Sequence, residues 1–237
     1  MNSVNESMSK VIDEPSLRNR EAVFNDRFHA GELLAEKLRK VEGIKEAIIL
    51  AIPAGGVQVA KVVSEKLSLP FELAITRKLH IPWNSEAGFG ALSWNGFMLL
   101  NEPLVKALGL SEEMIERCVA EEKETIEKRL KLFRDEKPFS DLHNRVVVVI
   151  DDGLASGFSM LTTLRTIRFE GASKVIVGVP TAHEGSIDLI GSDAEVIVCL
   201  NIRSSRFFAV ADAYKFWYDL NDDEVFILLK ESRFYLK

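Results

Sequence analysis

The sequence has few of the residues that usually cross-link small domains or bind transition metals. It contains two cysteines, Cys118 and Cys199, in 237 residues, too few for a disulfide framework. Its four histidines are scattered and lack the spacing of a zinc site: His29, His80, His143 and His183. We therefore expect both cysteines to be small buried apolar residues, and the chain to be stabilised by an apolar core, which its length permits.

Long apolar runs and an excess of positive charge are also lacking. No run approaches the roughly 18 residues needed to cross a bilayer. The polar start, MNSVNESMSK, has no apolar region typical of a signal peptide. The net charge of -6 disfavours nucleic acid as the main partner, although a local site can still bind an anion. These features predict a cytoplasmic protein that binds neither membrane nor nucleic acid.

Apolar strands alternate with amphipathic helices along the chain. Short apolar runs predict buried strands at residues 47–52, 71–76, 146–150, 174–179 and 194–200. Helical spacing of apolar residues predicts helices at residues 28–38, 57–67, 111–136 and 184–190, and one that begins near residue 160. This order predicts an α/β fold with a central, mostly parallel sheet flanked by helices.

The stretch VVVVIDDGLASGFSM, residues 146–160, carries the strongest chemical signal. Its strand ends at two adjacent acids, Asp151 and Asp152, and a turn of small residues then leads into a helix. Free N–H groups at a helix N-terminus bind anions, and glycine and serine add access and donors, so the turn predicts a phosphate site. Carboxylates suit sugar hydroxyls or a divalent cation, with magnesium expected. The alternative is a ligand-free turn whose acids only cap the helix.

Two further segments suit an anion. Pro53-Ala54-Gly55-Gly56 follows the strand at 47–52, and its two glycines expose N–H groups, although neither the Walker nor the GxGxxG spacing is present. Lys78 follows the strand at 71–76, at the sheet edge where open α/β folds bind ligands. The alternatives are a simple tight turn and a solvated basic pair.

The motif DDGLASGFS after an apolar strand resembles the phosphoribosyl pyrophosphate (PRPP) signature of type I phosphoribosyltransferases. The resemblance implies a Rossmann-like type I fold with a flexible loop or hairpin and a small C-terminal hood-like segment. It also implies an enzyme that uses PRPP and Mg²⁺ to transfer a 5-phosphoribosyl group to a nitrogenous base, with release of pyrophosphate. A regulator or sensor that binds PRPP without transferring it is the alternative.

The resemblance also assigns roles to individual residues. Asp151 and Asp152 would hold the ribose hydroxyls and the metal, in part through water, and would be catalytic together with Lys78. The 5-phosphate would be bound by Ala155, Ser156, Gly157, Phe158 and Ser159. Pyrophosphate would be bound by Ala54, Gly55, Gly56, Val57 and Lys78. Many relatives have arginine where this chain has Ala54, which removes a cationic contact and leaves more of the binding to backbone amides.

Similarity to an archaeal and bacterial branch of such proteins extends from about residue 24 onward, through RKLxxPxxxExGxGA from Arg77 and LNEPLVKALGLSEE from Leu100. We expect one domain, 1–237, with a loosely attached lead-in over about 1–20, an α/β core over 44–200 and an aromatic-rich segment over 201–237. Asn95-Gly96 predicts a hairpin turn. The irregular loop before it, 79–88, is a candidate lid, and the residues named for it are Arg77, His80 and Glu86.

Most aromatic residues of the last segment are expected in the core, with Phe207, Phe208 or Trp217 as candidates to line an acceptor pocket. A receiver-like phosphoacceptor is disfavoured, because its partner acid and lysine have no clear place and the Ser/Gly turn would be unexplained. The acceptor base is not determined by the sequence. The oligomeric state also stays open, with a homodimer as the commonest arrangement.

Overall fold

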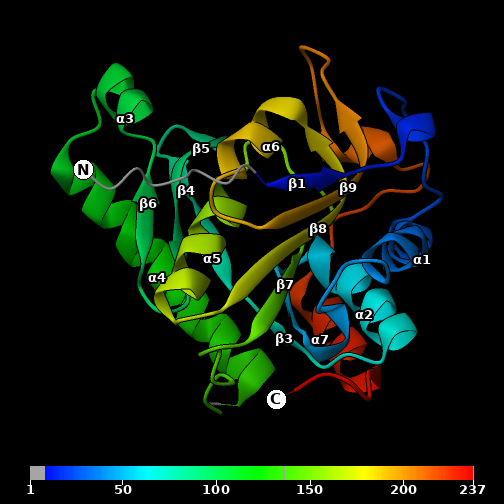
Figure 1. Cartoon of the computed structure of the whole chain (residues 1–237). Coiled ribbons are helices and arrows are strands. Elements are labelled where there is room, and N and C mark those ends of the chain that lie inside the picture. The colour runs from blue at the N-terminus through cyan, green and yellow to red at the C-terminus, as the bar shows by residue number, and fades with distance from the viewer. Residues whose placement is uncertain (1–8, 136, 237) are drawn as a thin grey trace, which may run out of the picture.

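A central parallel sheet organises the chain (Figure 1), whose computed structural model describes residues 9–135 and 137–236 without the side chains of Ser85 and Glu86. Neighbouring strands pair in parallel. Across the sheet the order is β1 (Lys10–Ile12), β9 (Val196–Arg203), β8 (Lys174–His183), β7 (Val146–Ile150), β2 (Ile48–Ala51) and β3 (Phe71–Leu73). The predicted α/β fold with a mostly parallel sheet is confirmed.

The apolar strands are buried on both faces, as their composition predicts. In β7, Val147 and Val149 belong to one apolar cluster, and Val148 and Ile150 belong to the other. All four side chains are 0% exposed. Because successive side chains of a strand point to opposite faces, one apolar run stabilises two layers at once.

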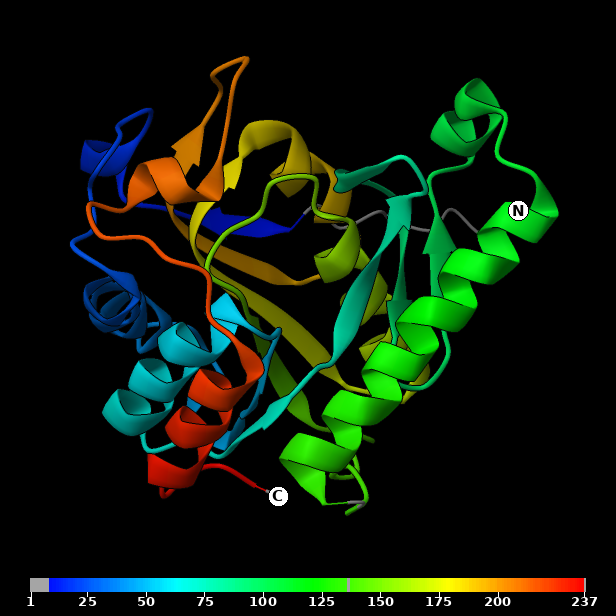
Figure 2. The ribbon, with the colours of Figure 1, turned by 180° about the vertical axis from the view of Figure 1, so that it is seen from behind.

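Helices cover both faces of the sheet. The helices α1 (Arg27–Leu38), α2 (Gly55–Leu67) and α7 (Asp222–Glu231) share one apolar cluster with it, and α5 (Phe158–Phe169) and α6 (Glu184–Ile190) share the other. Figures 1 and 2, seen from opposite sides, show these two groups of helices on opposite faces. Among the described residues, the main body also contains three short 3₁₀ helices: η1 (Pro15–Leu17), η2 (Ile44–Glu46) and η3 (Val210–Ala213).

A smaller antiparallel sheet lies beside the main body. It consists of β4 (Thr76–Ile81), β5 (Asn84–Ser93) and β6 (Met98–Leu100), followed by α3 (Glu102–Leu108) and the long helix α4 (Glu112–Arg134). Figure 2 shows α4 running along one side of this sheet. The hairpin predicted at Asn95-Gly96 is confirmed, since these residues connect β5 to β6 and Gly96 has a φ of +86°.

Two predictions about this region are wrong. The strand expected at 71–76 ends at Leu73, and Thr76 already belongs to β4 of the second sheet. The irregular loop expected at 79–88 is instead part of the paired strands β4 and β5. Glycine is depleted in strands and therefore suggested a loop. At Gly90 it is needed because a Cβ atom would lie 2.5 Å from the Leu99 carbonyl of β6.

The two ends of the chain are attached to the body. The lead-in was expected to be loosely attached, but Lys10–Ile12 pair with β9, so that prediction is wrong for these residues, while 1–8 lie outside the described part. The Phe24 N–H donates to the Ala213 carbonyl over 2.9 Å. Near the C-terminus, Tyr235 pairs with Phe71 at the edge of β3. The aromatic segment is therefore anchored by residues from the start of the chain.

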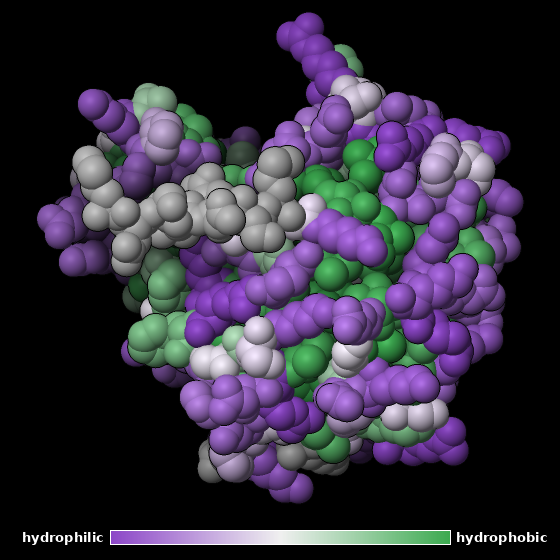
Figure 3. All heavy atoms as spheres, in the orientation of Figure 1, coloured by the Kyte–Doolittle hydropathy of each residue, from purple (hydrophilic) through white to green (hydrophobic). Residues whose placement is uncertain are grey.

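The surface in the orientation of Figure 1 has apolar side chains in its middle, crossed by rows of hydrophilic ones (Figure 3). On α5, Arg165 and Arg168 reach Asp193 and Glu195, which follow α6. Long cationic side chains cover apolar surface in this way while their charged ends stay in water. Within the described part of the chain, no helix combines the length and apolar character needed to cross a bilayer.

A buried ion pair at the end of α4 provides a stability test. Arg134 is 1% exposed, donates to Glu72 over 2.8 Å, and lies 4.0 Å from the Phe139 ring centre. The variant Arg134→Met leaves Glu72 charged and buried, which should lower the free energy of unfolding by about 3–5 kcal/mol. Adding Glu72→Gln should recover part of that loss. Urea unfolding measures both effects.

An exposed pair is the matched control. Arg117 and Glu121 of α4 are 82% and 64% exposed, so Arg117→Met should cost less than about 1 kcal/mol. Equal losses for the Arg134 and Arg117 variants would contradict the importance of burial.

Candidate functional site

The candidate site lies where β2 and β7 end side by side. From β2 the chain continues to β3 on one side, and from β7 it continues to β8 on the other side, so the order of strands reverses between them. The carboxyl ends of strands at such a point border the crevice in which open α/β sheets bind ligands. The turn 53–57 follows β2, and the turn 151–159 follows β7.

The two turns touch. A Cβ atom built on Gly55 would lie 1.7 Å from Asp152 Oδ2, and one on Gly56 would lie 2.9 Å from the Asp151 Cα. Both positions therefore need glycine, because any other residue would have to displace the acid pair. The glycines first noted for their exposed N–H groups also make room for the neighbouring carboxylates.

A pocket of about 200 Å³ lies at the end of β7. It places Lys78 and Asp151 opposite the small-residue turn. Its lining consists of Lys78, Asp151, Gly153, Leu154, Ala155, Ser156, Gly157, Ser159, Met160 and Val210. Residues separated by more than 70 positions in the sequence are thus brought to one opening, which combines a cation, a carboxylate and a turn rich in backbone donors. Asp152, Phe158 and the turn after β2 are not part of its lining.

The helices that begin at these two turns lack the caps found elsewhere in the described chain. Side chains cap α1, α3, α4, α6 and α7 by accepting a backbone N–H. The residues before α2 and α5 are Ala54 and Gly157, and neither supplies a side-chain cap. The N–H groups of a first helical turn need an acceptor. At these two helices an anionic ligand can provide it.

The turn at the start of α5 is fixed by its backbone conformation and by a contact from α6. Gly157 has a φ of +78°, a left-handed conformation that favours glycine. The Ser186 hydroxyl of α6 donates to the Ala155 carbonyl. The side chains of Ala155 and Ser156 are exposed. The turn therefore has a fixed backbone and an open outer face.

The turn after β2 contains a backbone hydrogen bond of its own. The peptide bond between Pro53 and Ala54 is cis, and the Val57 N–H donates to the Ala54 carbonyl over 3.1 Å. The Val57 amide, one of the four expected to bind pyrophosphate, is thus already engaged within the turn. The amides of Gly55 and Gly56 are the more suitable donors there.

The two acids have different surroundings. The carboxylate of Asp151 accepts the Asp152 N–H over 2.8 Å and faces the pocket. The carboxylate of Asp152 accepts from Arg27 Nε over 2.8 Å. Burial raises the pKa of Asp151 well above its ordinary value, and the negative charge of Asp152 raises it further.

Arg27 was not predicted as a site residue. Its signal in the sequence is a cation at the first position of α1, where the helix dipole favours anions. That signal shows that a partner is needed, but the partner lies 125 positions away and only the fold identifies it.

Lys78 reaches the pocket from the smaller sheet and not from the end of a strand in the main sheet, as the sequence suggested. It lies within β4, and its aliphatic stem crosses Gly88 of β5. A Cβ atom on Gly88 would lie 2.3 Å from Lys78 Cγ. The glycine therefore leaves the space that the lysine stem occupies.

The other residues named for a lid lie elsewhere. Arg77 Nε donates to Glu122 of α4 over 2.8 Å, and His80 Nε2 lies 3.9 Å from the same carboxylate. His80 lines a separate small pocket with Cys118, and it is not part of the lining around Asp151. The side chain of Glu86 lies outside the described part of the chain. The β4–β5 hairpin is thus tied to α4.

The aromatic segment packs only in part. Tyr214 is 5% exposed and donates to the Asp152 carbonyl over 2.6 Å. In contrast, Phe216 is 72% exposed, so the expectation that it belongs to the core is wrong. Phe207, named as a candidate for the acceptor pocket, is 83% exposed. Phe208 lies against His183, with the ring centres 5.9 Å apart.

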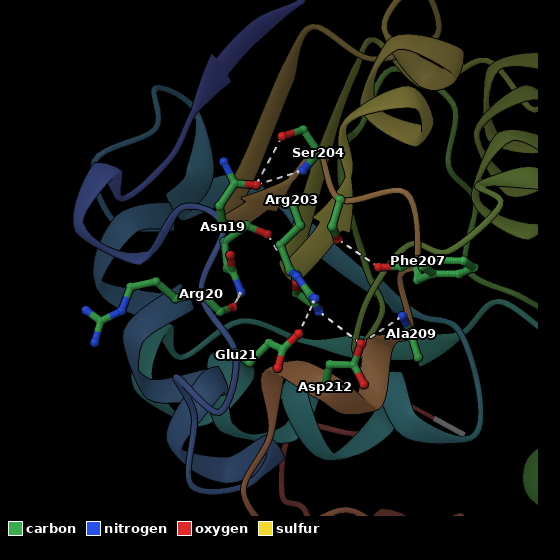
Figure 4. A network of polar contacts seen from close by, with 11 residues as sticks. Asn19, Arg20, Glu21, Arg203, Ser204, Phe207, Ala209 and Asp212 are labelled. Carbon is green, nitrogen blue, oxygen red and sulfur yellow. Dashed lines mark hydrogen bonds and ion pairs between the residues drawn. The ribbon is translucent and has the colours of Figure 1, made fainter.

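A polar network fixes the start of that segment (Figure 4). Arg203 is 3% exposed and contacts Glu21 over 2.9 Å and Asp212 over 3.2 Å. Figure 4 shows the Phe207 ring pointing away from this network. The ion pairs connect the end of β9 to η3, next to Val210 of the pocket lining.

Both cysteines are buried, as predicted, and burial raises the pKa of each thiol. They are therefore poor nucleophiles. In the described part of the chain, no three His, Cys, Asp or Glu side chains are grouped as a metal site.

Comparison with known proteins gives consistent matches. Residues 24–216 match the family model described as "Phosphoribosyl transferase domain". The crystal structure of TT1426 from Thermus thermophilus is 32% identical, with a TM-score of 0.70 over 88% of this chain and 98% of that one. "Putative phosphoribosyl transferase Rv0571c" of Mycobacterium tuberculosis is 31% identical over 210 residues, which are 89% of this chain and 47% of that protein. The chain spans about half the length of the curated relatives it matches.

Replacing Asp151 by Asn should stabilise the ligand-free protein near neutral pH. Because the folded pKa is raised, the folded state keeps a proton that the unfolded state releases, so stability falls as the pH rises above the ordinary carboxyl pKa of about 4. Asn cannot ionise and removes this loss, which is about 1.4 kcal/mol for each unit of pKa shift. Urea unfolding at acidic and at neutral pH measures the difference, which should grow as the pH rises.

Asp141, an exposed acid, provides the control, because Asp141→Asn should show no such growth with pH. A variant Asp151→Asn that is never more stable than the wild type would mean that burial of the acid costs nothing.

Proposed function

The chain belongs to the phosphoribosyl transferase domain family, and on that premise we propose that it transfers a 5-phosphoribosyl group from PRPP to a nitrogenous base or similar small acceptor, releasing pyrophosphate. The observation that carries the proposal is the pocket that joins Lys78, Asp151 and the turn at the start of α5. The donor-rich turn suits the 5-phosphate, the Asp151 carboxylate suits the sugar hydroxyls, and the Lys78 ammonium group suits pyrophosphate. The reaction belongs to nucleotide metabolism, which we propose takes place in the cytoplasm.

The ligand would lie along the crevice with its 5-phosphate at the α5 turn. Ser156 and Ser159 have hydroxyls that donate hydrogen bonds, and the uncapped amides of α5 add further donors. Asp151 would accept hydrogen bonds from the ribose hydroxyls. Pyrophosphate would lie toward Gly55 and Gly56, with Lys78 contributing a positive charge.

Magnesium fits this donor set only with help from the ligand. Asp151 is the carboxylate that lines the pocket, and Asp152 is engaged by Arg27. Mg²⁺ is commonly bound by one or two carboxylates together with waters and substrate phosphates, so Asp151 would hold it, directly or through water, beside the pyrophosphate oxygens. When bound, the metal neutralises charge on the leaving pyrophosphate.

The chain itself supplies positioned dipoles and a negative charge. Amides of the turn after β2 and the Lys78 ammonium group would stabilise the charge that builds up on pyrophosphate as its bond to the anomeric carbon breaks. Asp151, ionised when the metal is bound beside it, would favour the positive charge that develops on the sugar ring. These groups are held in place before the ligand arrives, so little reorganisation is needed in the transition state.

A PRPP-binding regulator is the second candidate, and Ala54 favours it. Ala54 has only a methyl group at a position where a cation would stabilise the leaving pyrophosphate. The turn at the start of α5, in contrast, has all of the groups proposed to bind phosphate. Such a protein would bind PRPP and release no pyrophosphate.

Pyrophosphate release separates these candidates. The protein is incubated with PRPP, Mg²⁺ and a panel of nucleobases, and pyrophosphate is measured with and without each base. Base-dependent release supports the transferase, and the variant Asp151→Asn should reduce it by at least about ten-fold, equivalent to about 1.4 kcal/mol. PRPP binding without release for any base supports the regulator. A protein that neither binds nor consumes PRPP contradicts both.

The variant Gly88→Ala tests how Lys78 is placed. The added methyl group meets the lysine stem and would lie 3.2 Å from the Leu79 carbonyl oxygen, so the lysine side chain should move from the pocket at a modest cost in stability. PRPP affinity should fall about ten-fold, the value of one hydrogen bond from a charged group. Calorimetry measures the affinity, and urea unfolding measures the stability.

Gly191→Ala is the matched control. Its Cβ atom would meet only carbonyl oxygens 3.4 Å away, remote from the pocket lining, so PRPP affinity should not change. Unchanged affinity in Gly88→Ala would show that Lys78 is not a ligand contact, or that its place does not depend on Gly88.

A further inference from the structure

Arg27 is an unusual residue for its position. It is the first residue of α1, where the helix dipole disfavours a cation, and it is only 4% exposed. Burial of an unpaired charge costs several kcal/mol, so such an arginine is stable only with a close partner. Its partners therefore indicate why it is there.

The guanidinium has partners on three sides. Its Nε donates to Asp152 Oδ2 over 2.8 Å, and a terminal nitrogen donates to the Tyr218 carbonyl over the same distance. The carbon of the guanidinium lies 3.8 Å from the centre of the Trp217 ring, a stacking contact typical of arginine. One acid of the pair after β7 is thus connected to the start of α1 and to the aromatic segment.

Asp152 is held from two more directions. The Tyr214 hydroxyl donates to the Asp152 backbone carbonyl over 2.6 Å, and the Asp152 side chain is 14% exposed. The position of a Cβ atom on Gly55 would be 1.7 Å from Asp152 Oδ2 and 3.0 Å from Arg27 Nε. The ion pair therefore lies directly against the turn after β2, whereas Asp151 lines the pocket.

From these contacts we propose that Arg27 is a positioning residue for the reaction. Arg27 takes the Asp152 carboxylate as its own partner and sets it against Gly55, which fixes the turn proposed to bind pyrophosphate. Asp151 is thereby left as the acid that meets the ribose and the metal. This division of roles rests on the proposed function.

A double-mutant cycle tests the proposal in the full-length chain. The variants are Arg27→Met, Asp152→Asn and the two combined, with Arg27→Lys as the conservative change. Calorimetry with PRPP and Mg²⁺ gives the dissociation constant, and urea unfolding gives the stability. If a base is turned over, the loss should appear in the KM for PRPP more than in kcat.

The expected result is a coupled loss of affinity. Arg27→Met should raise the dissociation constant for PRPP at least about ten-fold, because the freed carboxylate no longer supports the turn. Arg27→Lys keeps the charge and should recover part of the affinity. In the Asp152→Asn background, removing Arg27 should change the constant by less than about two-fold. The double variant has no unpaired buried charge, so a larger change in this background can still contradict the proposal if Arg27→Met alone fails to fold.

Arg134→Met is the matched control. Arg134 is equally buried, donates to one carboxylate over 2.8 Å and stacks on one aromatic ring, but it lies at the C-terminal end of α4 and is not part of the pocket lining. It should lose stability as Arg27→Met does, with PRPP affinity within about two-fold of the wild type. Affinity that follows stability in both variants would show a merely structural role and overturn the proposal.

Three other outcomes also overturn it. Arg27 does not act through Asp152 if the variant Arg27→Met binds PRPP as tightly as the wild type does. The same conclusion follows if removing Arg27 costs the same affinity whether position 152 carries Asp or Asn. A wild-type protein that binds no PRPP overturns the proposed function, and this inference with it.

Discussion

The backbone after β2 passes so close to the acids after β7 that no side chain fits between them. Gly55 and Gly56 satisfy this constraint, and the Asp152 carboxylate occupies the space that a side chain at 55 would need. Because the two strands are neighbours in a parallel sheet, their carboxyl ends meet at one crevice. The pocket, the uncapped helices and the buried ion pair are all arranged around this contact.

The site gathers groups that are costly for the folded protein on its own. Two adjacent carboxylates lie in partial burial, and two helices begin without side-chain caps. Each feature is unfavourable without a partner, and an anionic sugar with a metal would supply partners for several of them. Functional sites often carry such costs, which the remaining core must offset. Here the buried residues of strands β2 and β7 belong to that core.

Segments from both ends of the chain hold Asp152 in place. Arg27 begins α1, while Tyr214, Trp217 and Tyr218 belong to the aromatic segment, and all four meet around Asp152 or its partner. A second buried arginine, Arg203, fixes the start of the same segment (Figure 4). Tyr214 and Trp217 pack where the site offers a backbone acceptor and a buried cation. Phe207 and Phe216 belong to the same segment and are exposed.

The sequence by itself determined most of the local elements and the two turns that we propose bind anions. Apolar runs such as 146–150 predict buried strands because burial on both faces leaves no position for polar residues, and the small-residue turn after Asp151 and Asp152 needs no distant partner to be recognised. Tertiary structure alone decided that Thr76 leaves the main sheet, that 79–88 pairs as a hairpin, and that Lys78 crosses Gly88 to reach the pocket. It also decided that Arg27 and not solvent neutralises Asp152. Periodicity reports how a residue is buried, whereas the choice of partner depends on which distant segments the fold brings within a few ångströms.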